Sequence, residues 1–358
     1  LIYLDQEESP SLKEEKEPRY HALEVARLRA HAAQAVLMLS SSHPSVETAF
    51  RWRTHQQSLP SCLPAGLSTQ ASSSPSLSDR PHIDVIDIRG LSFGSWLSPS
   101  LLSHLEDTLR VGHRAALILN KKGFACTILC RDCGVTPECR RCSVRLTLHK
   151  QTAKLRCSYC GTVQAPPEVC PACAGTRLEA IGTGTERLEE DLRRRFPTAR
   201  LLRMDSDTAQ TPHQVDTLRQ AWRTGQFDLA VGTHMLLHTP IHEPIHLVAL
   251  PQADLGLHRP DYRAAEWTYH ALMNAAAVAR PATEGGRVVL QTHLPTHPVI
   301  VAVSQFNPTF FYEQEWAFRE ALGYPPFAQL INLCVSGLYD KTSQQAATQW
   351  VERLHHAV

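Results

Sequence analysis

Eight of the eleven cysteines in this 358-residue chain fall within 44 residues, as four C-x-x-C pairs. The pairs are Cys130 with Cys133, Cys139 with Cys142, Cys157 with Cys160, and Cys170 with Cys173. No basic-then-apolar leader opens the sequence, and in a non-secreted chain this spacing favours metal over disulfides. A C-x-x-C turn places two thiolates on one side of a tight knuckle, and two knuckles complete the tetrahedral S4 site that structural Zn2+ prefers. The sequence therefore predicts two zinc ions.

Four pairs can be matched in three ways, and the residues between them favour one way. Residues 143–156 alternate like a β-hairpin, which would join the pairs on either side of it. We therefore expect an inner cluster (Cys139, Cys142, Cys157 and Cys160) and an outer cluster (Cys130, Cys133, Cys170 and Cys173), each holding one zinc. Four thiolates leave no open coordination position, so both ions are structural. Iron–sulfur binding is the alternative, and the knuckle-and-hairpin spacing weighs against it.

The sequence on both sides of the cysteines alternates short apolar strands with amphipathic helices. Strands are expected at 1–5, within 33–45, and at 83–90, 115–120, 201–205, 228–233, 245–254 and 287–293. Helices are expected at 20–31, 97–109, 185–196, 213–224 and 262–280. This alternation predicts an α/β fold with a parallel, doubly wound sheet, into which the cysteine segment is inserted.

Charge and composition limit the possible partners. The chain is 43% hydrophobic and 20% charged with a net charge of +1, which is typical of a soluble globular protein. No apolar run reaches the ~18–20 residues of a membrane span. Residues 121–177, however, hold ten Lys or Arg against three acids, and stay positive after eight thiolates and two Zn2+ are counted. The patch either contacts nucleic-acid phosphates or only neutralises the zinc thiolates; the candidate contacts are Lys121, Lys122, Arg140, Arg141 and Arg145.

A series of motifs then resembles one known family. In order they are LIYLDQEE (1–8), PRYHALEVARLRA (18–30), NKKGFA (120–125), the eight cysteines, IGTGTERLEEDLRRRFP (181–197), GTHML (232–236), QADLGLHRPDYRAAE (252–266), VVLQTHLPTHPVI (288–300) and YEQEWAFREALGYPPF (312–327). This order resembles the PriA family (primosomal protein N′) of replication-restart helicases, over nearly the whole chain. The resemblance implies two RecA-like motor lobes, the first one partial, with an inserted binuclear zinc-ribbon module.

The resemblance also implies a division of the chain. Its parts are the end of lobe 1 (1–56), a Ser/Pro-rich linker (57–80), the start of lobe 2 (81–125), the two-zinc module (126–177), the remainder of lobe 2 (178–304) and the start of a C-terminal domain (305–358). The family's DNA-binding N-terminal domains and its Walker loop would lie upstream, and most of its C-terminal domain downstream. We therefore expect this chain to be a fragment.

The family is an ATP-driven motor that unwinds DNA 3′ to 5′, but several motor positions differ here. Where the family has D-E-E-H, this chain has Asp5-Gln6-Glu7-Glu8. Gln6 replaces the acid expected to orient the attacking water, and an amide cannot accept a proton from water. The S-A-T-P turn has become Ser41-Ser42-His43-Pro44, and a Lys-Gly loop has become Leu237-His238-Thr239.

The largest difference lies at the arginine-finger motif, Q-V-A-G-R-A-G-R in relatives. The matching residues are 274–281, where both arginines are replaced, by Val278 and Pro281. An arginine finger is worth about 10³–10⁵ in rate. Arg280 is displaced by one position, about 100° of rotation on a helix, and so should point elsewhere.

Together these differences favour a protein of replication restart that binds DNA forks and assembles the primosome without ATPase or helicase activity, so that no catalytic residue is expected. The expected partners are forked and single-stranded DNA, single-strand-binding protein, other primosome proteins and the machinery that loads the replicative helicase. The expected location is cytoplasmic and nucleoid-associated, with no membrane contact. The altered positions argue against ATP and Mg2+ as cofactors. The alternative is an active ATP-dependent 3′–5′ helicase with unusual motifs. A zinc protein unrelated to replication is a third hypothesis, which does not account for YPPF, DYRAAE and the nested cysteines together.

Overall fold

The computed structural model describes the chain with gaps. The described residues are 1–14, 19–58, 79–89, 91, 97–119, 127–141, 143–149, 153–157, 159–181, 185–205, 208–237, 239–330, 333, 335 and 340–357. They separate into two compact units, residues 1–316 and residues 317–358. Most of the expected linker lies outside the described residues.

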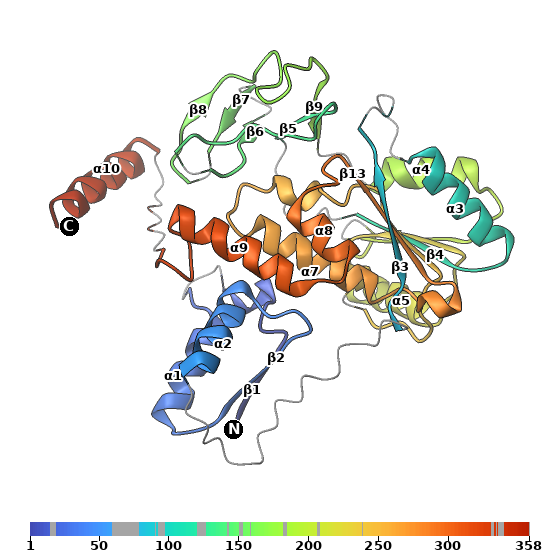
Figure 1. The fold of residues 1–358 in the computed structure, drawn as a ribbon, viewed down its shortest axis with the longest axis horizontal. Helices are drawn as coiled ribbons and strands as arrows, with labels where there is room; N and C mark the ends of the chain where they lie inside the picture. Colours follow the sequence, from blue (N-terminus) through green and yellow to red (C-terminus); the bar gives the residue numbers. More distant parts are fainter. Residues whose placement is uncertain are drawn as a thin grey trace. The chain divides into compact units, whose positions relative to one another are not determined.

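A six-stranded sheet forms the centre of the first unit (Figure 1). Its strands are β3 (His82–Asp87), β4 (Ala115–Ile118), β10 (Leu201–Met204), β11 (Leu229–Gly232), β12 (Leu247–Leu250) and β13 (Arg287–Thr292). They lie in the order β10-β11-β4-β12-β13-β3, and every neighbouring pair is parallel. All residues of β4, β11 and β12 are buried, as continuous apolar runs in a parallel sheet should be. The predicted α/β fold class is confirmed.

Helices cover both faces of this sheet. They are α3 (Pro99–Arg110), α4 (Thr185–Arg195), α5 (Pro212–Arg223), the short α6 (His234–Leu237), α7 (Ala264–Ala276) and α8 (Pro298–Ser304). On one face, Leu101 of α3 and Leu188 of α4 join Leu117 of β4 in one core. On the other face, α5, α7 and α8 contribute to a larger core that contains Trp222 and Tyr269. The sheet is therefore doubly wound, as the alternating pattern predicts.

Helix α7 ends earlier than its sequence suggests. We expected a helix over 262–280, but α7 stops at Ala276. Beyond it the backbone pairs with the chain before β12, because Ile245 N–H donates to Val278 O (2.9 Å) and Arg280 N–H donates to Ile245 O (2.8 Å). The chain therefore turns at Ala277 and Val278, and Ala279 forms an isolated parallel bridge with Ile245, so the expectation of a helical rotation at Arg280 is wrong.

The first 58 residues build a smaller parallel pair with helices. Strands β1 (Ile2–Asp5) and β2 (Leu37–Ser40) pair in parallel, and α1 (Ala22–Ala32) connects them after a 3-10 turn at Pro10–Leu12. A further helix, α2 (Val46–Ser58), is one that we did not predict. Its first N–H groups are bound by side chains from elsewhere: Glu7 accepts from Ser45 N–H (2.6 Å), and Glu266 accepts from Val46 N–H (2.8 Å). Ser45 also caps the helix locally, because its Oγ accepts from Thr48 N–H (3.2 Å), so local and tertiary contacts together satisfy the start of α2.

The zinc module (residues 126–177) is inserted into the sheet domain, and the strands at its two ends pair with each other. Strands β5 (Thr127–Cys130) and β9 (Leu178–Ile181) are antiparallel and form its base. Beyond them lies a three-stranded antiparallel sheet of β6 (Thr147–His149), β7 (Lys154–Arg156) and β8 (Val163–Gln164). The β6–β7 pair is the hairpin expected between the inner cysteine pairs.

The remaining elements are two 3-10 turns and two helices. The turns are Leu255–His258 and Ala282–Glu284, and the helices are α9 (Pro308–Leu322) and α10 (Asp340–Ala357). In the second unit Arg319 is fully buried and donates to Pro325 O (3.3 Å). Among the described residues, none of the helices has the length and apolar character needed to cross a bilayer.

Shortening a core side chain of β4 should destabilise the sheet domain. Leu117 has no exposed surface, so Leu117→Ala should lower the free energy of unfolding by about 2–5 kcal/mol, through lost burial and the cavity left behind. Leu28→Ala is a matched control, because Leu28 is 72% exposed and its loss should change stability by less than about 0.5 kcal/mol. Urea unfolding followed by tryptophan fluorescence measures both. Equal stabilities for the two variants would contradict the described core.

Candidate metal centre and nucleic-acid surface

The structure brings the four cysteines of the outer cluster together. The sulfurs of Cys130, Cys133, Cys170 and Cys173 all lie within 4.8 Å of one another. Cys130 Sγ is 3.6 Å from Cys173 Sγ, and Cys133 Sγ is 3.6 Å from Cys170 Sγ. Four sulfurs at this spacing fit the tetrahedral coordination of one Zn2+.

Three cysteines of the inner cluster also lie together. The sulfurs of Cys139, Cys157 and Cys160 fall within 4.8 Å of one another, and Cys139 Sγ is 3.5 Å from Cys160 Sγ. Cys142, the fourth expected ligand, lies outside the described residues. The chain thus provides sites for two structural zinc ions.

All four knuckles share one backbone geometry. In each, the residue four positions after the first cysteine donates its N–H to that cysteine's carbonyl, at 2.8–3.1 Å. That residue has a positive φ in every knuckle: Gly134 (77°), Ser143 (53°), Gly161 (71°) and Ala174 (59°). Glycine adopts this conformation freely, whereas a residue with a Cβ is strained in it by about 1–2 kcal/mol. Ser143 and Ala174 therefore hold conformations that metal coordination helps to stabilise.

Without a cation, the packed thiols differ in how readily they ionise. Burial raises the pKa of Cys130 and Cys157 above the usual value, and that of Cys133 to about 12. At Cys170 burial is outweighed by hydrogen bonds from the backbone of Cys173 and Ala172, which lower the pKa to about 7. Thiolates this close cannot all carry charge unless a metal ion lies among them. Zn2+ would supply that charge and displace the protons, so zinc binding should release protons and weaken at low pH. The donor set therefore fits structural zinc.

The basic residues of the zinc module fall into two groups. Arg131 donates to Glu179 (2.5 Å), Arg177 donates to Asp132 (2.6 Å), and Arg145 pairs with Glu138. These three guanidinium groups are neutralised inside the module. Arg140 and Arg141 are exposed, and no ion pair to either is found within the described part of the chain. Lys121 and Lys122 lie outside it.

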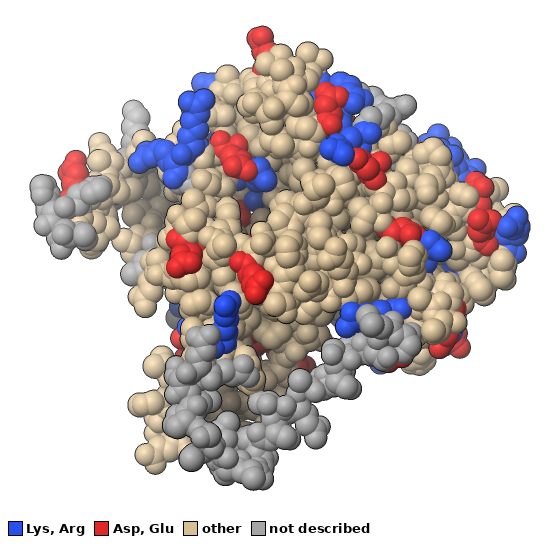
Figure 2. Space-filling model, in the orientation of Figure 1, with Lys and Arg blue, Asp and Glu red and all other residues tan. Residues whose placement is uncertain are grey.

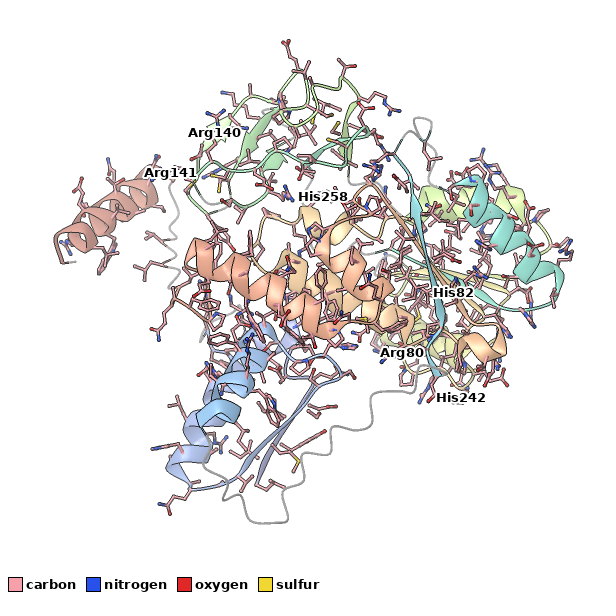
Figure 3. All side chains as sticks on the ribbon, in the orientation of Figure 1. Arg80, His82, Arg140, Arg141, His242 and His258 are labelled. Carbon is pink, nitrogen blue, oxygen red and sulfur yellow. The ribbon has the colours of Figure 1, made fainter. Side chains whose placement is uncertain are left out.

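In the view of Figure 2, blue side chains show at the end of the zinc module where Figure 3 labels Arg140 and Arg141. Of the three described residues that were predicted to contact nucleic acid, Arg140 and Arg141 have no ion pair and Arg145 has one. The guanidinium of Arg145, with its side chain 20% exposed, is committed to Glu138 and to Thr136 O.

The outer-cluster knuckle packs directly on the end of β13. A Cβ at Gly134 would lie 2.7 Å from both the Cβ and the carbonyl oxygen of His293, so only glycine fits there. Beside it, Arg131 Nη1 lies 3.1 Å from His293 Nε2. Leu129 of β5 also packs against Leu255 in a small apolar cluster. The module is thus tied to the carboxyl edge of the sheet.

A buried imidazole lies under this contact (Figure 3). His258 is 2% exposed, and its Nδ1 lies 3.3 Å from Thr136 Oγ1 of the zinc module. Burial lowers the pKa of His258 to about 3, against the opposing effect of nearby Asp254. Asp254 is itself buried, and the hydrogen bond and charge of His293 hold the pKa of its carboxyl below the usual value despite that burial.

Asp5, Gln6 and Glu7, at the end of β1 and just after it, have different environments. Asp5 is exposed and accepts hydrogen bonds from Ser40 and Tyr3, and the Ser40 bond is the main reason that its pKa is lowered. Gln6 has a positive φ of 51°. Glu7 is 3% exposed, and it accepts from Ser45 Oγ and Thr48 Oγ1 (3.0 Å each) besides Ser45 N–H. The Glu7 carboxylate is therefore held at the start of α2.

The positions matched to the arginine finger hold no guanidinium directed away from the protein. Val278 packs, partly buried, against the larger core. Pro281 precedes the 3-10 turn at 282–284. Arg280 donates from Nε to Pro244 O (3.1 Å) and from Nη1 to Glu284 (2.8 Å). Of the 237–239 loop, His238 lies outside the described residues, and Thr239 Oγ1 donates to Met235 O (2.8 Å).

Removing one ligand from either cluster should remove one zinc ion. Elemental analysis of the wild-type protein should give two zinc ions per chain, and Cys157→Ser and Cys170→Ser should each give one, because a serine hydroxyl does not replace a thiolate. Cys62→Ser, which changes a cysteine outside both clusters, should keep two. Iron in place of zinc, or a single zinc in the wild type, would overturn the assignment.

Acid should destabilise the protein partly through His258. Its folded pKa of about 3 lies below the unfolded value near 6.5, so the unfolded chain binds the extra proton between these pH values and stability falls as pH falls. From pH 6.5 to 5 the wild type should lose about 1–2 kcal/mol more than His258→Gln. Urea unfolding at each pH measures this difference, in which the contribution of the cysteines cancels. His31→Gln, which removes an exposed histidine, should follow the wild type. Parallel curves for wild type and His258→Gln would contradict the buried neutral imidazole.

Comparison with known proteins shows which family the module and the chain resemble. Residues 139–164 match the model of the PriA DNA helicase Cys-rich region (CRR) domain. Among solved structures, a single-residue variant of S. cerevisiae Dbp5 bound to RNA and ADP BeF3 is 10% identical, with a TM-score of 0.40, over 90% of this chain and 62% of that one. That likeness is too loose to bear on function.

Curated relatives match nearly the whole chain. Replication restart protein PriA of Treponema pallidum is 35% identical over 97% of this chain and 51% of its own length. The Bacillus subtilis protein of that name is 34% identical over 99% and 43%, and the Synechocystis protein is 35% identical over 95% and 41%. The chain thus spans about half the length of these relatives or less. With the matched cysteine region and this identity over nearly all of its residues, the chain belongs to the PriA family.

Proposed function

We propose that this chain is part of a replication-restart protein that binds DNA at forks and assembles the primosome without hydrolysing ATP. The relatives named above support the restart role, because they match the chain almost from end to end. The paired zinc clusters and the free arginines beside one of them support DNA contact. The changed motor positions support the absence of hydrolysis.

The observation that carries the proposal is the environment of residues 278–281. A motor needs a guanidinium opposite the γ-phosphate, and Val278 instead adds apolar surface to the core. Arg280 is the nearest substitute. Its Nε and Nη1 are bonded to Pro244 O and Glu284, and Glu243 lies 4.0 Å from Nη2. Reaching a phosphate would require breaking these contacts. The backbone of Arg280 is also held, because its N–H donates to Ile245 O (2.8 Å).

Glu7 supports the same proposal. The family places an acid of its D-E-E-H motif here, yet this carboxylate accepts three hydrogen bonds at the start of α2. A carboxylate at a helix N-terminus is stabilised there as an anion by the free N–H groups and the dipole. In this chain the Glu7 carboxylate stabilises the start of α2. The neighbouring Gln6 has no carboxylate that could orient the attacking water instead.

One feature favours the alternative of an active helicase. Asp5 is exposed at the carboxyl end of β1, and its pKa is lowered, so it is a charged group that could bind Mg2+. A metal ligand alone does not supply the water-orienting acid or the arginine finger. The alternative therefore needs two further groups from elsewhere in the protein.

The proposal extends to the partners and to the division of the chain. The proposed partners are forked and single-stranded DNA, single-strand-binding protein, other primosome proteins and the machinery that loads the replicative helicase, in the cytoplasm at the nucleoid. The proposed domains are those expected from the sequence, with residues 1–56 as part of lobe 1, 81–125 and 178–304 as lobe 2, and 305–358 as the start of a C-terminal domain.

The full-length protein should bind a forked DNA without DNA-stimulated ATP hydrolysis. Fluorescence anisotropy measures binding, and phosphate release with saturating fork measures turnover. Loss of the arginine finger alone should lower turnover about 10³-fold or more below that of an ATP-hydrolysing DNA helicase assayed in parallel. Turnover comparable to that enzyme would restore the active helicase as the better hypothesis. Failure to bind fork or single strand would remove the proposed role itself.

A further inference from the structure

The two knuckles of the inner cluster carry side chains that a zinc ion would hold close together. Arg140 and Arg141 lie between Cys139 and Cys142, and Tyr159 lies immediately before Cys160. Because Cys139 Sγ and Cys160 Sγ are 3.5 Å apart, the two loops meet at this point. The residues that flank these cysteines therefore share one end of the module.

The two arginines present charge that the fold does not use. Both are exposed, and neither forms an ion pair with any residue that the structure describes. The same module commits Arg131, Arg145 and Arg177 to acidic partners. Arg140 and Arg141 thus remain available for an anionic ligand, at the end of the zinc module where Figure 3 labels them.

Tyr159 gives this end a fixed aromatic surface. Its side chain is 43% exposed, while its hydroxyl oxygen accepts a hydrogen bond from Tyr262 N–H (3.2 Å). Tyr262 is in turn held by Arg263, whose Nε donates to the Tyr262 hydroxyl (2.8 Å). A ring anchored at its hydroxyl loses less rotational freedom when it stacks on a ligand than a mobile ring would.

Exposed arginines beside a fixed aromatic ring match the chemistry of single-stranded nucleic acid. Guanidinium groups bind backbone phosphates, and an unpaired base stacks on an aromatic face whatever its sequence. An acidic peptide would also satisfy the arginines, but its carboxylate side chains have no aromatic face to stack on the ring. Of these two ligands, the aromatic surface favours the nucleic acid.

We propose that Arg140, Arg141 and Tyr159 form a contact for single-stranded nucleic acid that the inner zinc ion assembles. This rests on the proposed DNA-binding function and assigns one part of it. The arginines bind neighbouring phosphates, and a base between them stacks on the Tyr159 ring. No sequence preference follows, because neither contact reads a base edge.

The charge contribution is tested with the full-length protein and a fluorescent 15-nucleotide dT oligomer. The double variant Arg140→Ala/Arg141→Ala should bind more weakly, and the slope of log affinity against log salt should fall in magnitude by about 1.4, since each lost phosphate contact on a single strand contributes about 0.7. The matched control is Arg110→Ala/Arg194→Ala, which removes two exposed arginines from α3 and α4. It should keep the wild-type slope.

The ring is tested separately from the charge. Tyr159→Ala should weaken dT binding about 5- to 150-fold with little change in salt slope, because it removes stacking alone. Tyr159→Phe keeps the ring and should retain most of the affinity. Ultraviolet cross-linking of a bromodeoxyuridine oligomer, followed by mass spectrometry, should place an adduct on the peptide that contains Tyr159. Each variant must first contain two zinc ions per chain.

Two outcomes separate this contact from the proposed function. If zinc-loaded variants bind dT as the wild type does, with its salt slope and with adducts elsewhere, this contact is wrong while fork binding stands. If the wild type binds an acidic peptide through these arginines and does not bind dT, the ligand class is wrong. If the wild type binds neither dT nor a fork, the proposed function fails as well.

Discussion

Thiolates this close together need a cation among them, and the zinc module depends on that requirement. Its own apolar core is a small group around Val144, Leu146 and Leu155, too few residues to fix the loops by burial alone. The backbone accepts a left-handed conformation at Ser143 and Ala174 to close the knuckles. Metal coordination supplies the free energy that burial lacks, which explains why a segment with so small an apolar core folds in the middle of an α/β domain.

The two clusters have different surroundings, and this difference gives the module its two sides. The outer-cluster knuckle carries Arg131 and Gly134, and both contact His293 at the end of β13. The inner-cluster knuckle carries Arg140 and Arg141, which have no such contact among the described residues. The outer site therefore positions the module on the sheet. The inner site presents its two arginines to solvent, and its Tyr159 hydroxyl accepts from Tyr262 N–H, which gives this end a second contact with the sheet domain.

The sequence predicted the features that depend on local pattern. Apolar runs located the strands of the sheet, because a strand buried on both faces leaves little room for polar residues. The cysteine spacing located both clusters. Helix α2 was not predicted, although Ser45 gives a local capping signal through Thr48 N–H; only the bonds from Glu7 and Glu266, one of them 220 residues away, depend on the fold. The end of α7 was placed four residues too late, because the pairing of residues 278–280 with Ile245 is not a local property. The sequence does not distinguish Arg145 from Arg140 and Arg141, because the ion pair of Arg145 with Glu138 forms only in the folded module.

The environments of Glu7 and Val278 also explain how a motor fold can persist after its chemistry is lost, as we propose here. Glu7 stabilises α2, and Val278 packs on the core of the sheet domain. Neither role involves a nucleotide. An arginine at 278 would have to place a charge near that core or reach past it for a phosphate, and without a bound phosphate the buried charge has only a cost. A protein released from the need to hydrolyse ATP would therefore gain stability from valine at this position. The same release would not remove the need for the cysteines, because their thiolates hold the zinc module together whether or not ATP is hydrolysed.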